Sequence, residues 1–218
     1  MRLSVVLFDG VQDLWDQAAQ KPFVVEMAKG TLDERRYRYY VIQDYLYLLD
    51  YIHILECTQE STDDGSLKDF IGFAIEQTRG ETLRVHVPNM RKLGITDDDV
   101  ARCPKAPEIA EYVEYMLGCL REDGVLAGLT ALLQCSWVYA YIAQRVLETH
   151  GSELPASPYK GWFDAYTCTE YLEANQRWID VLNKKAGSMQ GDEAQKLCGV
   201  FRTCAEHENK LWDMLYCV

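Results

Sequence analysis

Proline is scarce in this sequence of 218 residues, with six prolines at positions 22, 88, 104, 107, 155 and 158. Three long intervals, 23–87, 108–154 and 159–218, therefore lack the residue that most strongly breaks helices. Alternating runs typical of strands and Asn-Gly hairpin signals are also missing. These absences favour an all-α chain.

Positive charge is in short supply, since 22 Lys and Arg stand against 34 Asp and Glu and give a net charge of −12. Such a field repels phosphate backbones and anionic lipids, so we expect neither nucleic-acid binding nor direct regulation of DNA. No stretch approaches about 18 uncharged apolar residues, so we expect no membrane span. The N-terminal segment MRLSVVLFDGVQ lacks the small-residue cleavage site of a signal peptide.

Metal-binding patterns are absent as well. No Cys-x-x-Cys occurs among the eight cysteines, the four histidines are scattered, and no Gly-rich phosphate loop follows a strand-like run. The sequence therefore predicts neither a metal nor another cofactor. We expect the cysteines to be reduced thiols of a cytoplasmic protein, most of them packed as small hydrophobic side chains.

Helical spacing dominates the rest of the sequence. Hydrophobic residues make up 48% of the chain and charged residues 26%, which is typical of a soluble domain with a core. Capping signals at Thr31-x-x-Glu34, Thr96 and Ser157-Pro158 predict helix starts, the second of a short helix. Apolar steps of three and four predict helices near 11–29, 33–60, 65–92, 105–122, 124–149, 158–184 and 190–216. Because no composition shift divides them, we expect one all-α, single-domain helical bundle over residues 1–218.

One expected helix carries a carboxylate between phenols. Asp44, Tyr47 and Tyr51 are spaced i, i+3 and i+7 and so share one face. If that face is buried, Asp44 can accept hydrogen bonds from the phenols or from an amine-bearing ligand. The alternative is an acid at the surface, or a buried acid with no function.

A second helix carries a candidate nucleophile. Cys135 and Tyr139 stand i, i+4 in a strongly apolar segment. A buried thiol is usually inert because burial raises its pKa, so inert packing is the alternative. No histidine lies at helical spacing from Cys135, so a phenol or a carboxylate would have to serve as its proton partner.

The C-terminal helix carries one acid on its apolar stripe. Glu208 lies i+4 from Cys204 and i+7 from Phe201, so we expect it to face the core. A carboxyl group in that setting has its pKa raised and can hold a proton for general acid chemistry. The alternative, pairing with Arg202 or Lys210 on a solvated face, fits the neighbouring Glu206 better.

Together these segments resemble the TenA, or thiaminase II, family. The resemblance rests on Gln43-Asp44-Tyr45 with Tyr47, Cys135-x-Trp137-x-Tyr139, Tyr159-x-x-Trp162-x-x-x-Tyr166 and Glu208-x-x-Leu211-Trp212. Each motif is weak alone, but the four follow the family's order and spacing across residues 11–215. The resemblance implies a haem-oxygenase-like fold without haem, usually a homotetramer.

The same resemblance implies an aminopyrimidine aminohydrolase. Such an enzyme releases ammonia from 4-amino-5-aminomethyl-2-methylpyrimidine, returns the hydroxymethylpyrimidine to thiamin synthesis and hydrolyses thiamin more slowly. Cys135 would be the nucleophile, Glu208 would shuttle protons, and Asp44 would hold the ring nitrogen and the 4-amino group.

Four tyrosines complete the implied site. Tyr47 and Tyr139 would orient the thiol and the carboxylate, Tyr112 would contact the ring substituents, and Tyr166 would stack on the ring or close the pocket. They would use part of a large excess of phenols, 14 Tyr against 6 Phe.

Two positions depart from the family pattern. Gln134 stands where proline usually precedes the cysteine, and Leu211 where phenylalanine usually precedes the final tryptophan. These departures motivate an alternative, a non-catalytic helical protein that binds a pyrimidine or another small ligand. A metal-dependent oxidoreductase would need Glu-x-x-His pairs on facing helices, and none occurs in the sequence.

Overall fold

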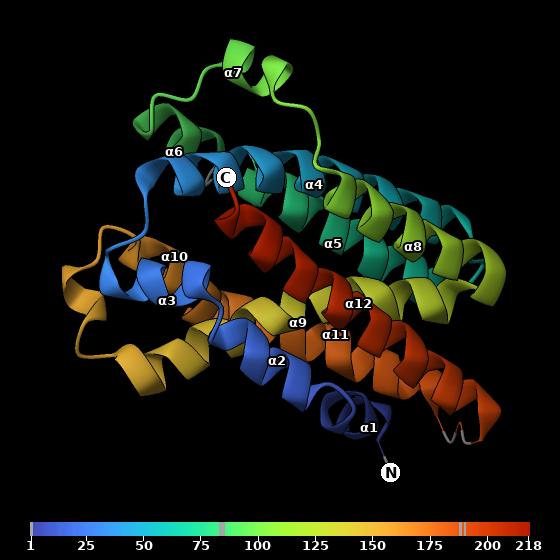
Figure 1. Ribbon diagram of the computed structural model, residues 1–218. Coiled ribbons are helices and arrows are strands. Elements are labelled where there is room, and N and C mark those ends of the chain that lie inside the picture. Colours follow the sequence, from blue (N-terminus) through green and yellow to red (C-terminus); the bar gives the residue numbers. More distant parts are fainter. Residues whose placement is uncertain (1, 83–85, 188, 190) are drawn as a thin grey trace. The chain divides into compact units, whose positions relative to one another are not determined.

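The computed structural model describes residues 2–82, 86–187, 189 and 191–218, and no strand occurs among them (Figure 1). The predicted all-α class is therefore confirmed. The chain divides into two compact units. Unit 1 contains Met1–Leu32 and Leu129–Cys217, and unit 2 contains Asp33–Gly128 and Val218.

Unit 1 is organised around the C-terminal helix. Its helices are α1 (Leu3–Asp9), α2 (Gln12–Ala19), α3 (Pro22–Lys29), α9 (Val125–His150) from Leu129 onward, the 3-10 turn η2 (Leu154–Ala156), α10 (Lys160–Thr167), α11 (Thr169–Ala186) and α12 (Asp192–Tyr216). Helix α12 packs against α1, α2 and α3, and α11 packs against α1 and α10. The largest fully buried side chains of this unit are Trp15, Phe23, Phe163, Phe201 and Trp212.

Unit 2 is organised around its longest helix. Its helices are α4 (Glu34–Glu60), α5 (Gly65–Glu81), α6 (Val87–Lys92), α7 (Asp97–Arg102) and α8 (Pro107–Asp123), followed by the first turn of α9. Helix α4 packs against α5, α6 and α8. The largest fully buried side chains here are Tyr112, Ile54, Leu55, Ile71 and Met116.

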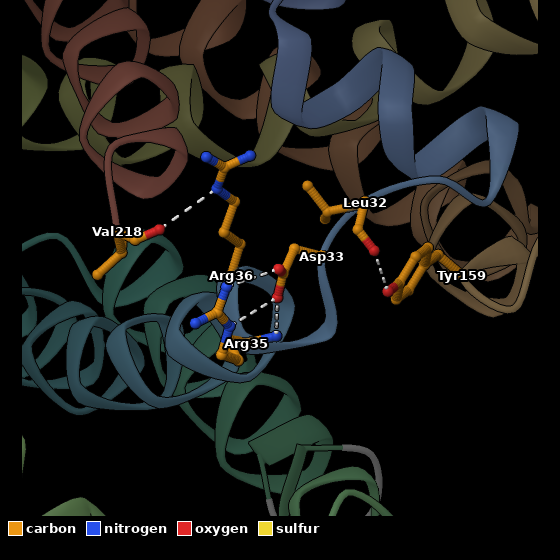
Figure 2. Close-up of polar contacts among 6 residues, drawn as sticks. All are labelled: Leu32, Asp33, Arg35, Arg36, Tyr159 and Val218. Carbon is orange, nitrogen blue, oxygen red and sulfur yellow. Dashed lines mark hydrogen bonds and ion pairs between the residues drawn. The ribbon is translucent and has the colours of Figure 1, made fainter.

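Helix α4 starts at a cap that the sequence did not predict. Asp33 is the N-cap residue, and its Oδ1 accepts a hydrogen bond of 2.8 Å from the backbone N–H of Arg35 (Figure 2). The expectation that Thr31 caps this helix was wrong. The N–H of Thr31 donates to the carbonyl of Glu26 at 2.9 Å, so Thr31 still belongs to the end of α3, where Gly30 takes the left-handed conformation with φ 70°.

The Ser157-Pro158 signal was also wrong as a helix start, because α10 begins three residues after Ser157. The Ser157 hydroxyl donates to the carbonyl of Met27 at 2.6 Å and accepts from the N–H of Tyr159 at 3.1 Å. Tyr159 in turn donates from its Oη to the carbonyl of Leu32 at 2.9 Å (Figure 2). These polar residues hold the segment before α10 against the end of α3.

Most of the predicted helices are confirmed within a few residues. Helices α4, α8, α9 and α12 match the expectations for 33–60, 105–122, 124–149 and 190–216, although residue 190 lies outside the described residues. The short helix after Thr96 is confirmed as α7, with the Thr96 hydroxyl and the Asp99 carboxylate each accepting from the other's backbone N–H. Helix α1 was not predicted.

Two predicted helices were too long. The expected 11–29 splits into α2 and α3, because Pro22 restricts Lys21 to an extended conformation with ψ 138°. The expected 158–184 splits into α10 and α11 at Cys168, which is extended with ψ 153°. The bounds of the expected 65–92 match the start of α5 and the end of α6, and its residues 83–85 lie outside the described residues.

Helix α9 is the one helix, among residues that the structure describes, long and apolar enough to cross a membrane. The expectation that no such stretch exists was wrong. Thr130, Gln134 and Ser136 lie within this helix, but they are uncharged and leave it apolar enough on average. The most apolar window of α9 is 72% buried inside the fold. Burial of this extent is what the core helix of a folded domain shows.

Candidate active site

The predicted site residues fall into two sets, one in each unit. Cys135, Tyr139, Tyr166 and Glu208 belong to unit 1, and Asp44, Tyr47 and Tyr112 belong to unit 2. All seven are buried. That the two sets serve one substrate stays a prediction.

In unit 2, Asp44 lies in a buried polar cluster on α4. Its Oδ2 is 3.3 Å from Nδ1 of His86, which immediately precedes α6, and Tyr40 hydrogen-bonds to the same carboxyl group. Burial raises the pKa of Asp44, while His86 and Tyr40 act in the opposite direction because both favour the charged form. The expectation of a buried carboxyl group near a phenol is confirmed. His86 was not predicted, since it lies far along the chain, at the residue before α6.

Tyr47 lies on the same face of α4 as Asp44 and stacks against Tyr112 of α8. Their ring centroids are 5.8 Å apart with planes inclined by 16°, and Tyr51 lies 6.1 Å from Tyr47. The Tyr47 hydroxyl also lies 4.0 Å from the sulfur of Met116. The expected shared, inward face of Asp44, Tyr47 and Tyr51 is thus confirmed, and α8 supplies its aromatic partner.

Gln43, next to Asp44, holds the segment that leads into α8. Its Nε2 donates to the carbonyl of Pro104 at 2.9 Å and lies 3.3 Å from the sulfur of Cys103, while its Oε1 accepts from the N–H of Ala106 at 2.8 Å. Ala106 is the N-cap residue of α8. Gln43 therefore fixes the start of the helix that carries Tyr112.

In unit 1, an aromatic cluster surrounds Tyr139. Its ring centroid is 5.0 Å from that of Tyr166, 5.6 Å from Trp212 and 5.7 Å from Trp162. Trp162 is itself 4.6 Å from Tyr166. The structure thus brings Tyr139 and Tyr166 together as predicted, and it adds two tryptophans that the sequence placed in motifs without a role.

Cys135 lies on α9, one turn before Tyr139, and is 8% exposed. The next residue, Ser136, is held by α11: its hydroxyl donates to Oδ1 of Asn175 at 2.7 Å, and its carbonyl accepts from Oη of Tyr171 at 2.9 Å. The Tyr171 ring also meets the Tyr166 ring edge-on at 5.0 Å. These contacts, which the sequence did not reveal, fix the turn of α9 that carries the thiol.

Glu208 is 1% exposed on α12, on the same face as the fully buried Phe201 and Cys204. The expectation that it faces the core is confirmed. Glu206, by contrast, lies 3.8 Å from Nε of Arg202 in an ion pair near the surface. Helical spacing alone separated these two acids correctly.

All eight cysteines are free thiols in the structure. Burial raises the pKa of Cys57, Cys119 and Cys198. Within the described part of the chain, no group of three or more His, Cys, Asp or Glu side chains is placed to hold a metal ion.

Known proteins of similar sequence cover the whole chain. It is 29% identical over 219 residues to the aminopyrimidine aminohydrolase of Helicobacter pylori, covering 99% of both chains. It is 26% identical over 217 residues to the aminopyrimidine aminohydrolase of Halalkalibacterium halodurans, covering 99% of this chain and 96% of that one.

A solved structure shares the fold. The TenA homologue from P. horikoshii OT3 superposes with a TM-score of 0.85 at 25% identity, covering 100% of this chain and 99% of that one. Such structures have the helical haem-oxygenase-like fold, so the predicted fold type is confirmed. The TENA/THI-4/PQQC family model matches residues 9–218. Since this match spans nearly the entire sequence, the chain belongs to the TENA/THI-4/PQQC family.

Proposed function

We propose that this protein is an aminopyrimidine aminohydrolase of thiamin salvage. It would convert 4-amino-5-aminomethyl-2-methylpyrimidine and water to the 5-hydroxymethyl compound and ammonia, and hydrolyse thiamin more slowly. The observation that carries the proposal is the full-length similarity to curated enzymes of that name. Those relatives confirm the expectation that the chain is an enzyme of this class.

Cys135 supplies the nucleophile in this proposal. The Cys135 thiol gives up its proton as its sulfur adds to the ring carbon beside C5, a C–S bond forms, and the displaced electron pair moves to the ring nitrogen, which takes up that proton. The electron pair then returns towards C5 and expels the amine from the exocyclic methylene. One difficult displacement thereby becomes a series of easier steps.

Glu208 moves the protons of the leaving and entering groups. It protonates the amine, which departs as ammonia, and it accepts a proton from the water that adds to the methylene carbon. The C–S bond then breaks, and the ring nitrogen gives back its proton. Burial of Glu208 supports this role because it keeps bulk water away from the transferred proton.

Asp44 and four tyrosines bind the ring and orient the groups that react with it. Asp44 would hold a ring nitrogen and the 4-amino group, and Tyr112 would contact the ring substituents. Tyr47 and Tyr139 would orient the carboxyl group and the thiol, and Tyr166 would stack on the ring. The stacked Tyr47–Tyr112 pair supports this division, since flat aromatic surfaces suit a flat heterocycle.

The test is ammonia release from the aminomethylpyrimidine by purified protein. Wild-type protein should turn over, and Cys135→Ser should not. Cys119→Ser is the matched control, because Cys119 is 6% exposed against 8% for Cys135 and has no role in the proposed site. Wild-type protein that is inert on every 5-substituted aminopyrimidine would refute the proposal. Tight binding of the ring without turnover would identify a non-catalytic binding protein instead.

Assembly and location belong to the proposal too. The family resemblance implies a homotetramer made of one TenA-like domain per chain, residues 1–218, with a small aminopyrimidine or thiamin as its partner, and the reduced cysteines imply a cytoplasmic location. Light scattering coupled to size-exclusion chromatography tests the tetramer, since a monomer of 25.1 kDa would elute with one quarter of the expected mass.

A further inference from the structure

A histidine with no role in the proposed chemistry lies against the ring-binding carboxyl group. His86 Nδ1 is 3.3 Å from Asp44 Oδ2, with side-chain exposures of 13% and 9%. His86 immediately precedes α6, and α6 packs on α4, which carries Asp44. The other group that acts on this carboxyl is the Tyr40 hydroxyl, from one turn earlier in α4. The contact is therefore an internal feature of unit 2.

The chemistry of the ring edge decides what this histidine can do. The 4-amino group of an aminopyrimidine donates hydrogen bonds, whereas the adjacent ring nitrogen accepts one. An ionised carboxylate has acceptors only, so it satisfies the amino group and sets a lone pair against the ring nitrogen. A carboxyl group that carries one proton matches both atoms. Binding across this edge therefore needs one proton at Asp44.

We propose that His86 supplies the proton that Asp44 shares with the ring nitrogen of the bound pyrimidine. The N–H bond at Nδ1 of the imidazolium breaks, an O–H bond forms on Asp44, and the acid donates to the ring nitrogen. The imidazole left behind is neutral, and it takes the same proton back from Asp44 when the product leaves. His86 is thus a positioning residue that acts through Asp44. This inference rests on the proposed function, since it takes Asp44 as the group that meets the ring.

The charges on the neighbouring elements fit this arrangement. On α4, the next acid along is Asp50, which pairs with Lys105 of the segment before α8. His53 of the same helix is exposed and lies beside Glu56 and Cys57. Among the pairings of the described residues, His86 is the basic side chain placed at Asp44.

The test is a double-mutant cycle read out as the dissociation constant of the product, 4-amino-5-hydroxymethyl-2-methylpyrimidine, by calorimetry. His86→Leu should weaken binding by about tenfold or more, the loss expected for one charge-assisted hydrogen bond. His86→Asn, which keeps a donor near the Nδ1 position but cannot release a proton, should fall between. His53→Leu, the matched control on α4, should bind like wild type.

Asp44→Asn gives the decisive comparison. An asparagine amide carries one donor and one acceptor permanently, as in its pairing with adenine, so it needs no proton from His86. In that background His86→Leu should change the dissociation constant by less than about twofold, the scatter of independent sites. A structural role for His86 would persist there and would refute the inference, as would wild-type binding by His86→Leu.

Turnover separates the inference from the function it rests on. In wild-type protein with ammonia release, His86→Leu should raise KM more than it lowers kcat, because the loss is in ring binding. Wild-type protein that neither binds nor converts the pyrimidine refutes the proposed function itself. If His86→Leu fails to fold by circular dichroism, the same cycle is run with His86→Asn, whose loss should again vanish beside Asp44→Asn.

Discussion

The side chain of Gln43 gives a quantitative test of how unit 2 is held together. Gln43 is 1% exposed, and its amide makes hydrogen bonds of 2.9 and 2.8 Å with the Pro104 carbonyl and the Ala106 N–H. Gln43→Leu keeps the apolar bulk of the side chain but leaves the Pro104 carbonyl and the Ala106 N–H without their hydrogen-bond partner. Leaving the buried Ala106 N–H without a partner costs about 1–3 kcal/mol, and the carbonyl of Pro104, an exposed residue, loses a hydrogen bond worth about 1 kcal/mol. We therefore expect a loss of about 3 kcal/mol in the free energy of unfolding.

For a protein of this size, each kcal/mol lowers the melting temperature by about 2–4 °C, so Gln43→Leu should melt about 6–12 °C below wild type. Gln59→Leu is the control within the same helix. Gln59 is half-buried, and its side-chain amide donates one hydrogen bond of 2.9 Å to the Lys68 carbonyl. It should lose about 1 kcal/mol, or about 4 °C at most. Equal melting temperatures for the two variants, followed by circular dichroism, would refute the reasoning.

Three further predictions concern single substitutions. Gly30→Ala should lose about 1–3 kcal/mol in thermal unfolding, because φ is +70° and the new Cβ would lie 3.0 Å from Pro158 Cδ, whereas Gly65→Ala, with nothing within 4 Å, should match or exceed wild type. Tyr171→Phe should lose about 1 kcal/mol in urea unfolding, because it gives up the hydrogen bond to the Ser136 carbonyl while keeping the ring against Tyr166. No loss would contradict the claim that Tyr171 helps to fix the turn of α9 that carries Cys135. Asp44→Asn should gain stability over wild type as the pH rises from about 4 to 8. Burial raises the pKa of Asp44 above its ordinary 3.8, so the folded state binds the proton more tightly than the unfolded state does, and wild type loses stability with rising pH. A constant difference in melting temperature across that range would argue against a raised pKa for the buried Asp44.

Local spacing in the sequence was enough to place the main site residues on buried faces. Glu208 was assigned to the core because it repeats the register of Phe201 and Cys204, and it is 1% exposed. Asp44 shares its inward face with Tyr47 for the same reason. Such arguments succeed because helical periodicity is set within one or two turns.

Contacts between distant segments could not be predicted in this way. His86 meets Asp44, and Tyr171 meets the carbonyl of Ser136, only through the packing of separate helices. The break at Cys168 has no proline or glycine to announce it. Pro22 did indicate a helix break, but the unbroken apolar period on both sides of it led to the prediction of a single helix. In the structure Pro22 holds Lys21 in an extended conformation, and the helix breaks there.

A crystal structure of the wild-type protein with the product hydroxymethylpyrimidine tests the central claim most directly. The proposed chemistry predicts the ring nitrogen and 4-amino group within hydrogen-bond distance of Asp44, with the Cys135 sulfur beside the ring carbon next to C5. It also predicts the Glu208 carboxyl group near the exocyclic hydroxymethyl. A ring bound away from Asp44, Cys135 and Glu208, or no ring at saturating concentration, would contradict the account.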